Sequence, residues 1–179
     1  MTPTADLLAP MRFAYADPPY FGCGARYKDN HAEWAKWNTI EAHADLINHL
    51  AHNYPDGWAL SLGSNNLQDI LPLCPKGVRV GSWVKPFASF KPNVNPAYAW
   101  EPVIFTGGRK RDRRSDTIRD YHSENITLKK GLCGAKPAGF ALWIAQLLGA
   151  DASIGDTIDD LFPGTGGMLT VWKSKGIAV

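Results

Sequence analysis

The stretch Asp17-Pro18-Pro19-Tyr20 places a carboxylate and an aromatic ring on either side of two prolines. Proline fixes its own φ and lacks an N–H, so neither proline can continue a strand ladder or lie inside a helix. Each proline also pushes the residue before it toward extended geometry. The apolar run from Phe13 to Ala16 therefore predicts a strand that ends abruptly, with Asp17 and Tyr20 at a stiff, exposed tip. A carboxylate and a flat ring held in this way suit the edge of an active site.

A second loop, Asp160 to Gly167, combines an acid with several glycines between a predicted strand and a predicted helix. Gly164 and Gly166 would let a ligand approach the backbone closely, and a helix N-terminus offers N–H groups that have no partner within the helix. The loop lacks the lysine of a phosphate-binding P-loop and the third glycine of the dinucleotide pattern. By itself it fits a ligand site and a plain helix start equally well.

A short basic run lies beyond the middle of the chain, and its charge would suit a DNA phosphate backbone. A solvated surface loop explains such a run equally well. The formal net charge of +2 is too small to indicate a partner. Lys85, in a different loop, is expected to be an ordinary surface lysine. The members of the basic run are Arg109, Lys110, Arg111, Arg113 and Arg114.

Composition narrows the class of protein. A hydrophobic share of 45% and a charged share of 20% over 179 residues are typical of one globular domain that can bury a core. Three cysteines without a CxxC pair argue against a disulfide framework and against a zinc site. No apolar run approaches the ~20 residues of a membrane span, and no secretion leader is evident. We therefore expect a cytoplasmic protein that needs no metal.

Strand and helix patterns alternate along the chain and would position these loops. This alternation indicates an α/β fold with a largely parallel sheet. Asn38 followed by Glu41 has the spacing of a capping box at the start of the first helix. Strands are expected at 13–16, 57–63, 77–84, 100–108 and 156–160, and helices at 38–54, 64–71, 136–150 and from 167 toward 175.

Three features in this order resemble the amino-methyltransferases that use S-adenosylmethionine: DPPY at a strand tip, a helix led by Lys136-Pro137, and D-x-F-x-G-x-G after a further strand. The catalytic motif comes first and the glycine loop comes late. This order is similar to the permuted beta group of DNA adenine-N6 and cytosine-N4 methyltransferases, here in a small, phage-like form. WEPVIFTGGR, which begins at Trp100, also resembles a late strand of that family. The resemblance spans Phe13 to Gly167.

The resemblance implies a permuted Rossmann-like methyltransferase sheet with flanking helices, and it implies roles for individual residues. The Asp17 carboxylate and the Pro18 carbonyl would accept hydrogen bonds from the target amine, and Tyr20 would stack on the base. A base in a duplex would first have to be flipped out. The implied catalytic residues are Asp17, Pro18, Pro19 and Tyr20, and the implied cofactor residues are Asp160, Phe162, Gly164, Gly166, Lys136 and Pro137. From their position directly after the tip, Phe21, Arg26 and Tyr27 are expected to hold the flipped nucleotide, and the charge of the basic run suits contact with the DNA backbone.

The sequence departs from the family pattern in its glycine loop, where Pro163 and Thr165 also replace the commoner alanine and serine, and at its C-terminal end. Leu161 stands where the glycine loop of the family usually has proline, and the chain ends at Val179, where the family has a further strand with an acidic tip. We therefore expect a C-terminally shortened sheet, with the strands of Phe13 and Asp160 adjacent at its centre. We also expect weak S-adenosylmethionine binding, or completion of the site by a homodimer or a partner subunit.

Together these features predict a single domain, 1–179. Its catalytic half is 11–106, its basic, candidate target-recognition segment is 107–134, and its cofactor-loop half is 135–179. The predicted activity is methyl transfer from S-adenosylmethionine to the N6 amine of adenine in DNA. Asp17 favours adenine, since cytosine-N4 enzymes more often carry serine there. DNA cytosine-N4 transfer, RNA adenosine transfer and a catalytically degenerate nucleic-acid-binding module remain as alternatives.

Overall fold

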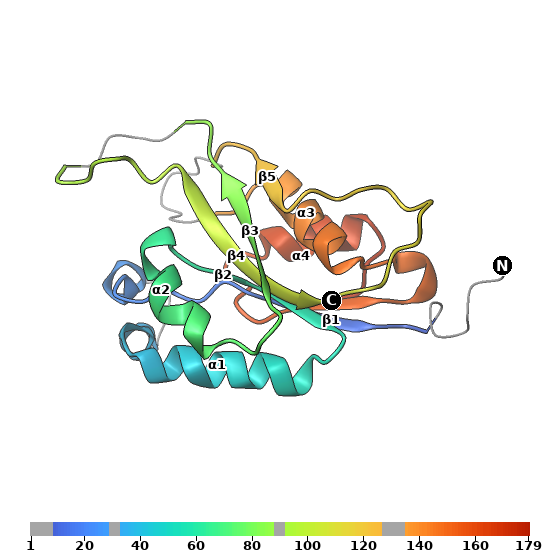
Figure 1. The fold of residues 1–179 in the computed structure, drawn as a ribbon, viewed down its shortest axis with the longest axis horizontal. Coiled ribbons are helices and arrows are strands. Elements are labelled where there is room, and N and C mark those ends of the chain that lie inside the picture. The colour runs from blue at the N-terminus through green and yellow to red at the C-terminus, as the bar shows by residue number, and fades with distance from the viewer. Residues whose placement is uncertain (1–8, 29–32, 88–91, 127–134) are drawn as a thin grey trace.

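The structure, a computed structural model, describes residues 9–28, 33–87, 92–126 and 135–179. Within them, one sheet of six strands has the order β5-β3-β4-β2-β1-β6 (Figure 1). The mixture of strands and flanking helices confirms the α/β fold class. The strands are β1 (Arg12–Ala16), β2 (Gly57–Ser61), β3 (Arg79–Val84), β4 (Trp100–Gly107), β5 (Tyr121–Ser123) and β6 (Thr157–Asp160).

The sheet is mixed rather than largely parallel. Strand β1 runs parallel to both β2 and β6, but β4 is antiparallel to its neighbours β2 and β3. The connection from β3 to β4 has no helix in its described residues, 85–87 and 92–99. A loop suffices between antiparallel strands, whereas parallel strands need a longer crossover. The short strand β5, which pairs in parallel with β3, was not predicted. Its three residues carry too weak a pattern to be read from sequence.

Strands β1 and β6 are adjacent, as expected, with Tyr15 opposite Asp160. The expected central position of β6 was wrong. Among the described strands β6 lies at the edge of the sheet, and beyond it only an isolated parallel bridge joins Thr157 to Ala178.

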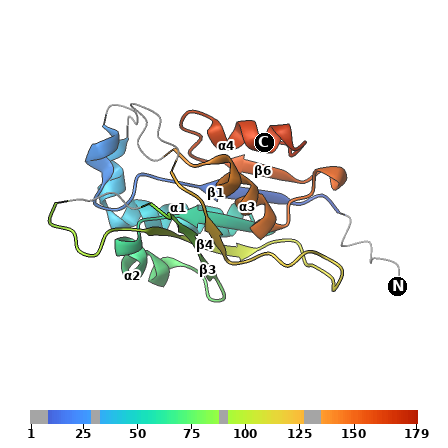
Figure 2. The ribbon, with the colours of Figure 1, turned by 90° about the horizontal axis from the view of Figure 1, so that it is seen from above.

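Helices cover both faces of the sheet (Figures 1 and 2). On one face pack α1 (Ile40–Asn53) and α2 (Leu67–Ile70), and on the other pack α3 (Ala138–Leu148) and α4 (Gly167–Ser174). The expected capping box of α1 was wrong. Thr39 takes the N-cap position, and the Asn38 side chain instead accepts a hydrogen bond from the backbone N–H of Gly24, at 3.0 Å. No helix in the described ranges is long and apolar enough to cross a membrane.

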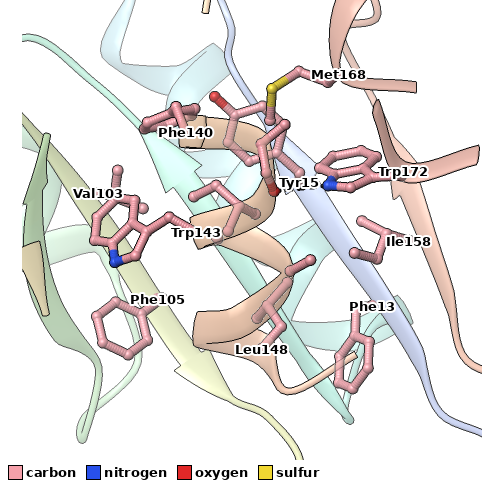
Figure 3. Packing of buried hydrophobic residues seen from close by; sticks show 14 of the residues in the cluster. Phe13, Tyr15, Val103, Phe105, Phe140, Trp143, Leu148, Ile158, Met168 and Trp172 are labelled. Atoms are coloured by element: carbon pink, nitrogen blue, oxygen red, sulfur yellow. Dashed lines mark hydrogen bonds between the residues drawn. The ribbon is translucent and has the colours of Figure 1, made fainter. Parts of the chain in front are cut away.

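Strand β1 is buried on both faces because its side chains alternate between the two helical layers. Phe13 and Tyr15 point toward α3 and α4 (Figure 3). Ala14 and Ala16 pack on the other side, with α1. The ring centroid of Tyr15 lies 6.1 Å from that of Phe140, in an edge-to-face arrangement. The strand that carries the DPPY tip is therefore fixed by packing on both sides.

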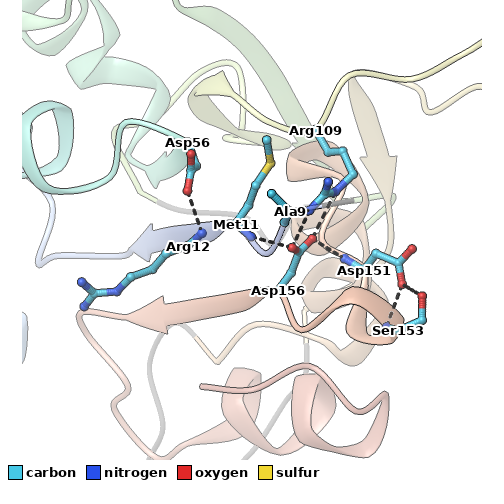
Figure 4. A network of polar contacts seen from close by, with 8 residues as sticks. All are labelled: Ala9, Met11, Arg12, Asp56, Arg109, Asp151, Ser153 and Asp156. Carbon is cyan, nitrogen blue, oxygen red and sulfur yellow. Dashed lines mark hydrogen bonds and ion pairs between the residues drawn. The ribbon is translucent and has the colours of Figure 1, made fainter. Parts of the chain in front are cut away.

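A buried carboxylate, Asp156, joins the amino ends of β1 and β6 (Figure 4). It accepts hydrogen bonds from the backbone N–H groups of Met11 and Asp151, each at 2.8 Å, and pairs with the Arg109 guanidinium at 2.5 Å. Arg109 also donates to the Ala9 carbonyl at 2.9 Å. The first residue of the basic run is therefore part of the fold.

We expect Arg109→Met to lower the free energy of unfolding by about 2 kcal/mol, because it leaves a buried carboxylate without its cation. The two backbone donors to Asp156 remain and limit the loss. Urea denaturation measures the change. Arg113→Met, at an exposed position of the same run, is the control and should stay within about 0.5 kcal/mol of the wild type. Equal stability of the two variants would contradict a structural role for Arg109.

Candidate active site

The loops singled out by sequence meet at one edge of the sheet. Asp17 follows the carboxyl end of β1, and Asp160 ends the parallel strand β6. Glu101 lies near the start of the antiparallel strand β4, which brings it to the same edge. The chain leaves β1 for β2 on one side and returns as β6 on the other. Ligand crevices of open α/β sheets lie at such a switch point, beyond the carboxyl ends of the strands.

A lysine lies at the centre of this edge. The Lys136 ammonium is 3.1 Å from Oδ1 of Asp17, 3.2 Å from Oε2 of Glu101 and 2.9 Å from the Tyr20 hydroxyl, to which it donates. The Tyr20 hydroxyl in turn donates to Oε2 of Glu101 at 2.7 Å. Glu101 also pairs with Lys85. We call Asp17, Tyr20, Lys85, Glu101 and Lys136 the charged cluster.

The contact between Lys136 and Asp17 is an ion pair without hydrogen-bond geometry. Oδ1 of Asp17 is buried and has no hydrogen-bond partner within the described residues, although the ammonium is close. The charge of this oxygen is thus balanced, but its directional acceptor position is unused. A donor that enters the site from a ligand can take that position.

Aromatic rings surround the Lys136 ammonium. It lies 5.4 Å from the ring centroids of both Tyr20 and Trp83 and 5.8 Å from that of Phe140. Cation–π attraction of this kind strengthens when the cation is removed from water. The Lys136 side chain is only 5% exposed, so rings and carboxylates together hold its charge in place.

Charges within the cluster control one another's ionisation. Burial opposes the ionisation of Glu101, but Lys136 and Lys85 outweigh it and lower the pKa of that carboxyl to about 2. Burial, and then Glu101, raise the pKa of Asp17, while Lys136 lowers it. Burial likewise acts against the charge of Lys136, but Asp17 and Glu101 outweigh it and raise the lysine pKa above its ordinary value.

Two expectations for the DPPY tip need correction. The Asp17 side chain is only 22% exposed, so the tip is largely buried, and Lys136 from the segment before α3 contacts it. The Tyr20 hydroxyl also makes hydrogen bonds with Glu101 and Lys136, which a role in stacking alone does not require. Pro18 and Pro19 are buried beside it.

Tyr20→Phe should therefore cost about 1–3 kcal/mol of stability, because it takes one hydrogen bond from each of two buried charges, Glu101 and Lys136. The ring remains, so stacking on a base should persist. Thermal denaturation against Tyr121→Phe measures the effect. That exposed hydroxyl contacts Arg119, and its loss should change stability by less than about 0.5 kcal/mol. Equal melting temperatures of both variants would contradict a stabilising role for the hydrogen bonds of the Tyr20 hydroxyl.

The acid of the glycine loop has one satisfied oxygen and one unsatisfied oxygen. Oδ1 of Asp160 accepts a hydrogen bond from the Phe162 N–H at 3.1 Å, whereas Oδ2 is buried without a hydrogen-bond partner in the described part of the chain. Burial, with a smaller contribution from Asp17, raises the pKa of Asp160 to about 6. A ligand cation at Oδ2 would stabilise the ionised form.

The loop beyond Asp160 is open. A Cβ added to Gly164 or to Gly166 would meet no atom within 4 Å. Both glycines have positive φ, +49° and +76°, where side chains are rarely accommodated. Phe162 packs edge-to-face on Trp37, with ring centroids 5.1 Å apart. Tyr20 and Phe162 thus lie at the same end of the sheet, as the resemblance requires.

The remaining predicted residues are not all brought together. Phe21 packs against His43, with ring centroids 6.0 Å apart, while the side chains of Arg26 and Tyr27 lie outside those described. The contacts of Lys136 are with other members of the charged cluster and not with the glycine loop, and Pro137 precedes α3.

The basic run lies at the other end of the sheet (Figure 2). It follows Gly107, whose partner Gly57 begins β2, and Arg109 reaches the amino end of β6. Arg111 donates to the Gln146 carbonyl near the end of α3. Contact of the run with nucleic acid stays a prediction, and it would be made far from a base held at Tyr20.

Sequence reasoning missed two members of the charged cluster. Glu101 was noted only as part of a family-like strand, and Lys85 was expected to be an ordinary surface residue. In fact the Lys85 and Glu101 side chains are 13% and 19% exposed and pair with each other. The glutamate inside the apolar strand pattern of β4 was the available signal, because a carboxylate at such a position usually has a partner.

No family model and no curated protein matches the chain. Solved structures do match, at low sequence identity. The M1.HpyAVI–SAM complex aligns with a TM-score of 0.59 at 13% identity, over 95% of this chain and 80% of that one. TTHA0409 from Thermus thermophilus, named "Putative DNA Modification Methylase", aligns with a TM-score of 0.55 in its complex with S-adenosyl-L-methionine. The identity is 16%, over 95% of this chain and 80% of that one. The chain therefore has the fold of these methyltransferase structures.

Proposed function

We propose that this chain transfers a methyl group from S-adenosylmethionine to the N6 amine of adenine in DNA. The observation that carries the proposal is the pairing of β1 with β6, which sets the Asp17 tip beside the Asp160 loop at the switch point of the sheet. One loop would hold the amine and the other the methyl donor. The fold shared with M1.HpyAVI and TTHA0409 supports the same assignment.

The residues at the glycine loop fit S-adenosylmethionine. The unpaired, buried Oδ2 of Asp160 suits the amino group of its methionine part, and the open backbone at Gly164 and Gly166 leaves room beside it. When bound, this cofactor would supply a methyl group on a positively charged sulfur. As the amine nitrogen took up the methyl, the carbon–sulfur bond would break to leave a neutral thioether, and the amine would release one proton. Phe162 would form one wall of the site.

Asp17 is proposed to bind the exocyclic amine of the target base. The lone pair of an exocyclic amine is delocalised into the ring, so acceptors for its two N–H groups help the nitrogen toward sp³ geometry as it attacks. Oδ1 of Asp17 has an unused acceptor position, and the Pro18 carbonyl is proposed as the second acceptor. Because β1 is packed on both faces, the carboxylate is preorganised, which makes such electrostatic stabilisation effective.

Adenine N6 is preferred to cytosine N4 because position 17 is aspartate, the residue for which the resemblance implies adenine. Flipping a paired base costs a few kcal/mol, and the Tyr20 ring is the proposed platform that offsets part of it. The basic run and Phe21, Arg26 and Tyr27 are proposed to contact the nucleic acid.

A methyl-transfer assay with labelled S-adenosylmethionine tests the proposal. The substrates are duplex DNA, the same duplex with every adenine already N6-methylated, and RNA of the same sequence, and nucleoside mass spectrometry identifies the product. We expect N6-methyladenine from the unmodified duplex only. If N4-methylcytosine forms, cytosine replaces adenine as the proposed target; if RNA is methylated, RNA replaces DNA as the proposed substrate. Cofactor and DNA binding without transfer would favour a degenerate binding module.

A further inference from the structure

Two carboxylates at the candidate site share a single ammonium. Oδ1 of Asp17 and Oε2 of Glu101 lie 3.1 and 3.2 Å from Nζ of Lys136. The three side chains are 22%, 19% and 5% exposed, so water screens them only weakly. Two carboxylates that share one site oppose each other's ionisation, and loss of the cation between them raises the pKa of one of them.

The two carboxylates are not equivalent. Glu101 has further partners, since Lys85 pairs with it and the Tyr20 hydroxyl donates to it at 2.7 Å. Asp17 has an ion pair with Lys136 alone among the described cations. The proton taken up on loss of Lys136 would therefore go to Asp17.

The other titratable groups that face Asp17 do not replace this cation. Tyr15 from β1 and Tyr20 from the DPPY tip are neutral, because burial, and then Asp17, raise the pKa of each hydroxyl well above its ordinary value. Asp160 from β6 and Glu101 from β4 are acids. Lys136, from the segment before α3, is the positively charged residue in contact with Asp17.

We propose that Lys136 is a positioning residue that keeps the Asp17 carboxylate ionised and in place, held itself by Glu101 and by the rings of Tyr20, Trp83 and Phe140. This role differs from the cofactor role that the resemblance implies for Lys136, and the function proposed above does not include it. Only the kinetic consequence of the inference rests on the proposed function. An ionised Asp17 accepts a hydrogen bond from an amine, whereas a protonated Asp17 has a proton of its own to donate.

Carbon-13 NMR of the carboxyl groups in aspartate-labelled protein tests the inference without any substrate. The Asp17 signal is identified by its loss in Asp17→Asn. In Lys136→Met we expect the titration midpoint of Asp17 to rise by about 1–3 pH units, the usual effect of an opposite charge at this distance. Lys136→Arg should keep the midpoint near that of the wild type. Lys136→Gln offers a second neutral variant, which can hydrogen-bond to Glu101 and Tyr20, should the methionine variant fold poorly.

Lys85→Met is the matched control, because it removes the same charge from the same cluster but from a lysine paired with Glu101. It should move the Asp17 midpoint less than Lys136→Met does. An unchanged midpoint in both neutral Lys136 variants, or an equal rise in Lys85→Met, would overturn the inference.

The kinetic arm follows kcat/KM for methyl transfer against pH. In Lys136→Met the acid limb should move upward by the same amount as the NMR midpoint, so that the activity lost on the acid side is recovered as the pH is raised. A uniform loss at every pH would show that the lysine is structural and overturn the positioning role. If the wild type transfers no methyl group to any nucleic acid, the proposed function fails, but the NMR arm still decides the role of Lys136.

Discussion

Replacing Asp17 with asparagine should lower the rate of methyl transfer about 10²–10³-fold, the usual cost of losing one preorganised electrostatic partner of a transition state. The amide keeps the shape of the side chain but loses the charge that makes Oδ1 a strong acceptor. Single-turnover measurements at saturating cofactor and DNA isolate this step from binding. Asp17→Ala should lose at least as much.

Asp159→Asn is the control for this substitution. Asp159 lies on β6 next to Asp160, but it pairs with Arg12 at 2.5 Å and accepts from the Tyr54 hydroxyl at 2.7 Å, outside the charged cluster. Its variant should turn over within a few-fold of the wild type. Near-normal turnover in Asp17→Asn would remove Asp17 from the mechanism, whatever the control does.

Local chemistry made the two loops of the candidate site predictable. Two consecutive prolines remove two neighbouring ladder donors, which predicts the end of the buried strand β1 and the position of Asp17 and Tyr20 beyond it. Glycines after an acid indicate an open turn before a helix, and Gly166 is in fact the residue before α4. Both rules act within a few residues, and the resemblance added their order along the chain.

Contacts between distant residues were not predictable in the same way. Nothing near Lys136 in the sequence indicates that it meets Asp17 and Glu101, which lie 119 and 35 positions away. That meeting depends on the antiparallel direction of β4, which places Glu101 at the same edge of the sheet as Asp17. The basic run is a further case, because a count of charges cannot reveal that Arg109 has a buried partner, Asp156.

The second large effect is expected at the glycine loop. Gly164→Val should weaken S-adenosylmethionine binding by at least about 100-fold, or about 2.7 kcal/mol. The protein itself leaves the space beside Gly164 empty, so a branched side chain there would collide with the ligand rather than with the fold. Isothermal titration calorimetry on the variant measures the loss directly. The positive φ of +49° adds strain, because valine is disfavoured in that region by about 1–2 kcal/mol.

Gly77→Val separates strain from steric blocking. Gly77 also has a positive φ, +91°, and a Cβ there would likewise meet no atom within 4 Å, but it precedes β3 at the far end of the sheet. Both variants should melt at similarly lowered temperatures, while only Gly164→Val loses the cofactor. Unchanged binding in Gly164→Val would mean that this loop is a helix start and that Asp160 has another partner. Equal loss of binding in both variants would mean that general destabilisation, and not contact with the ligand, is responsible.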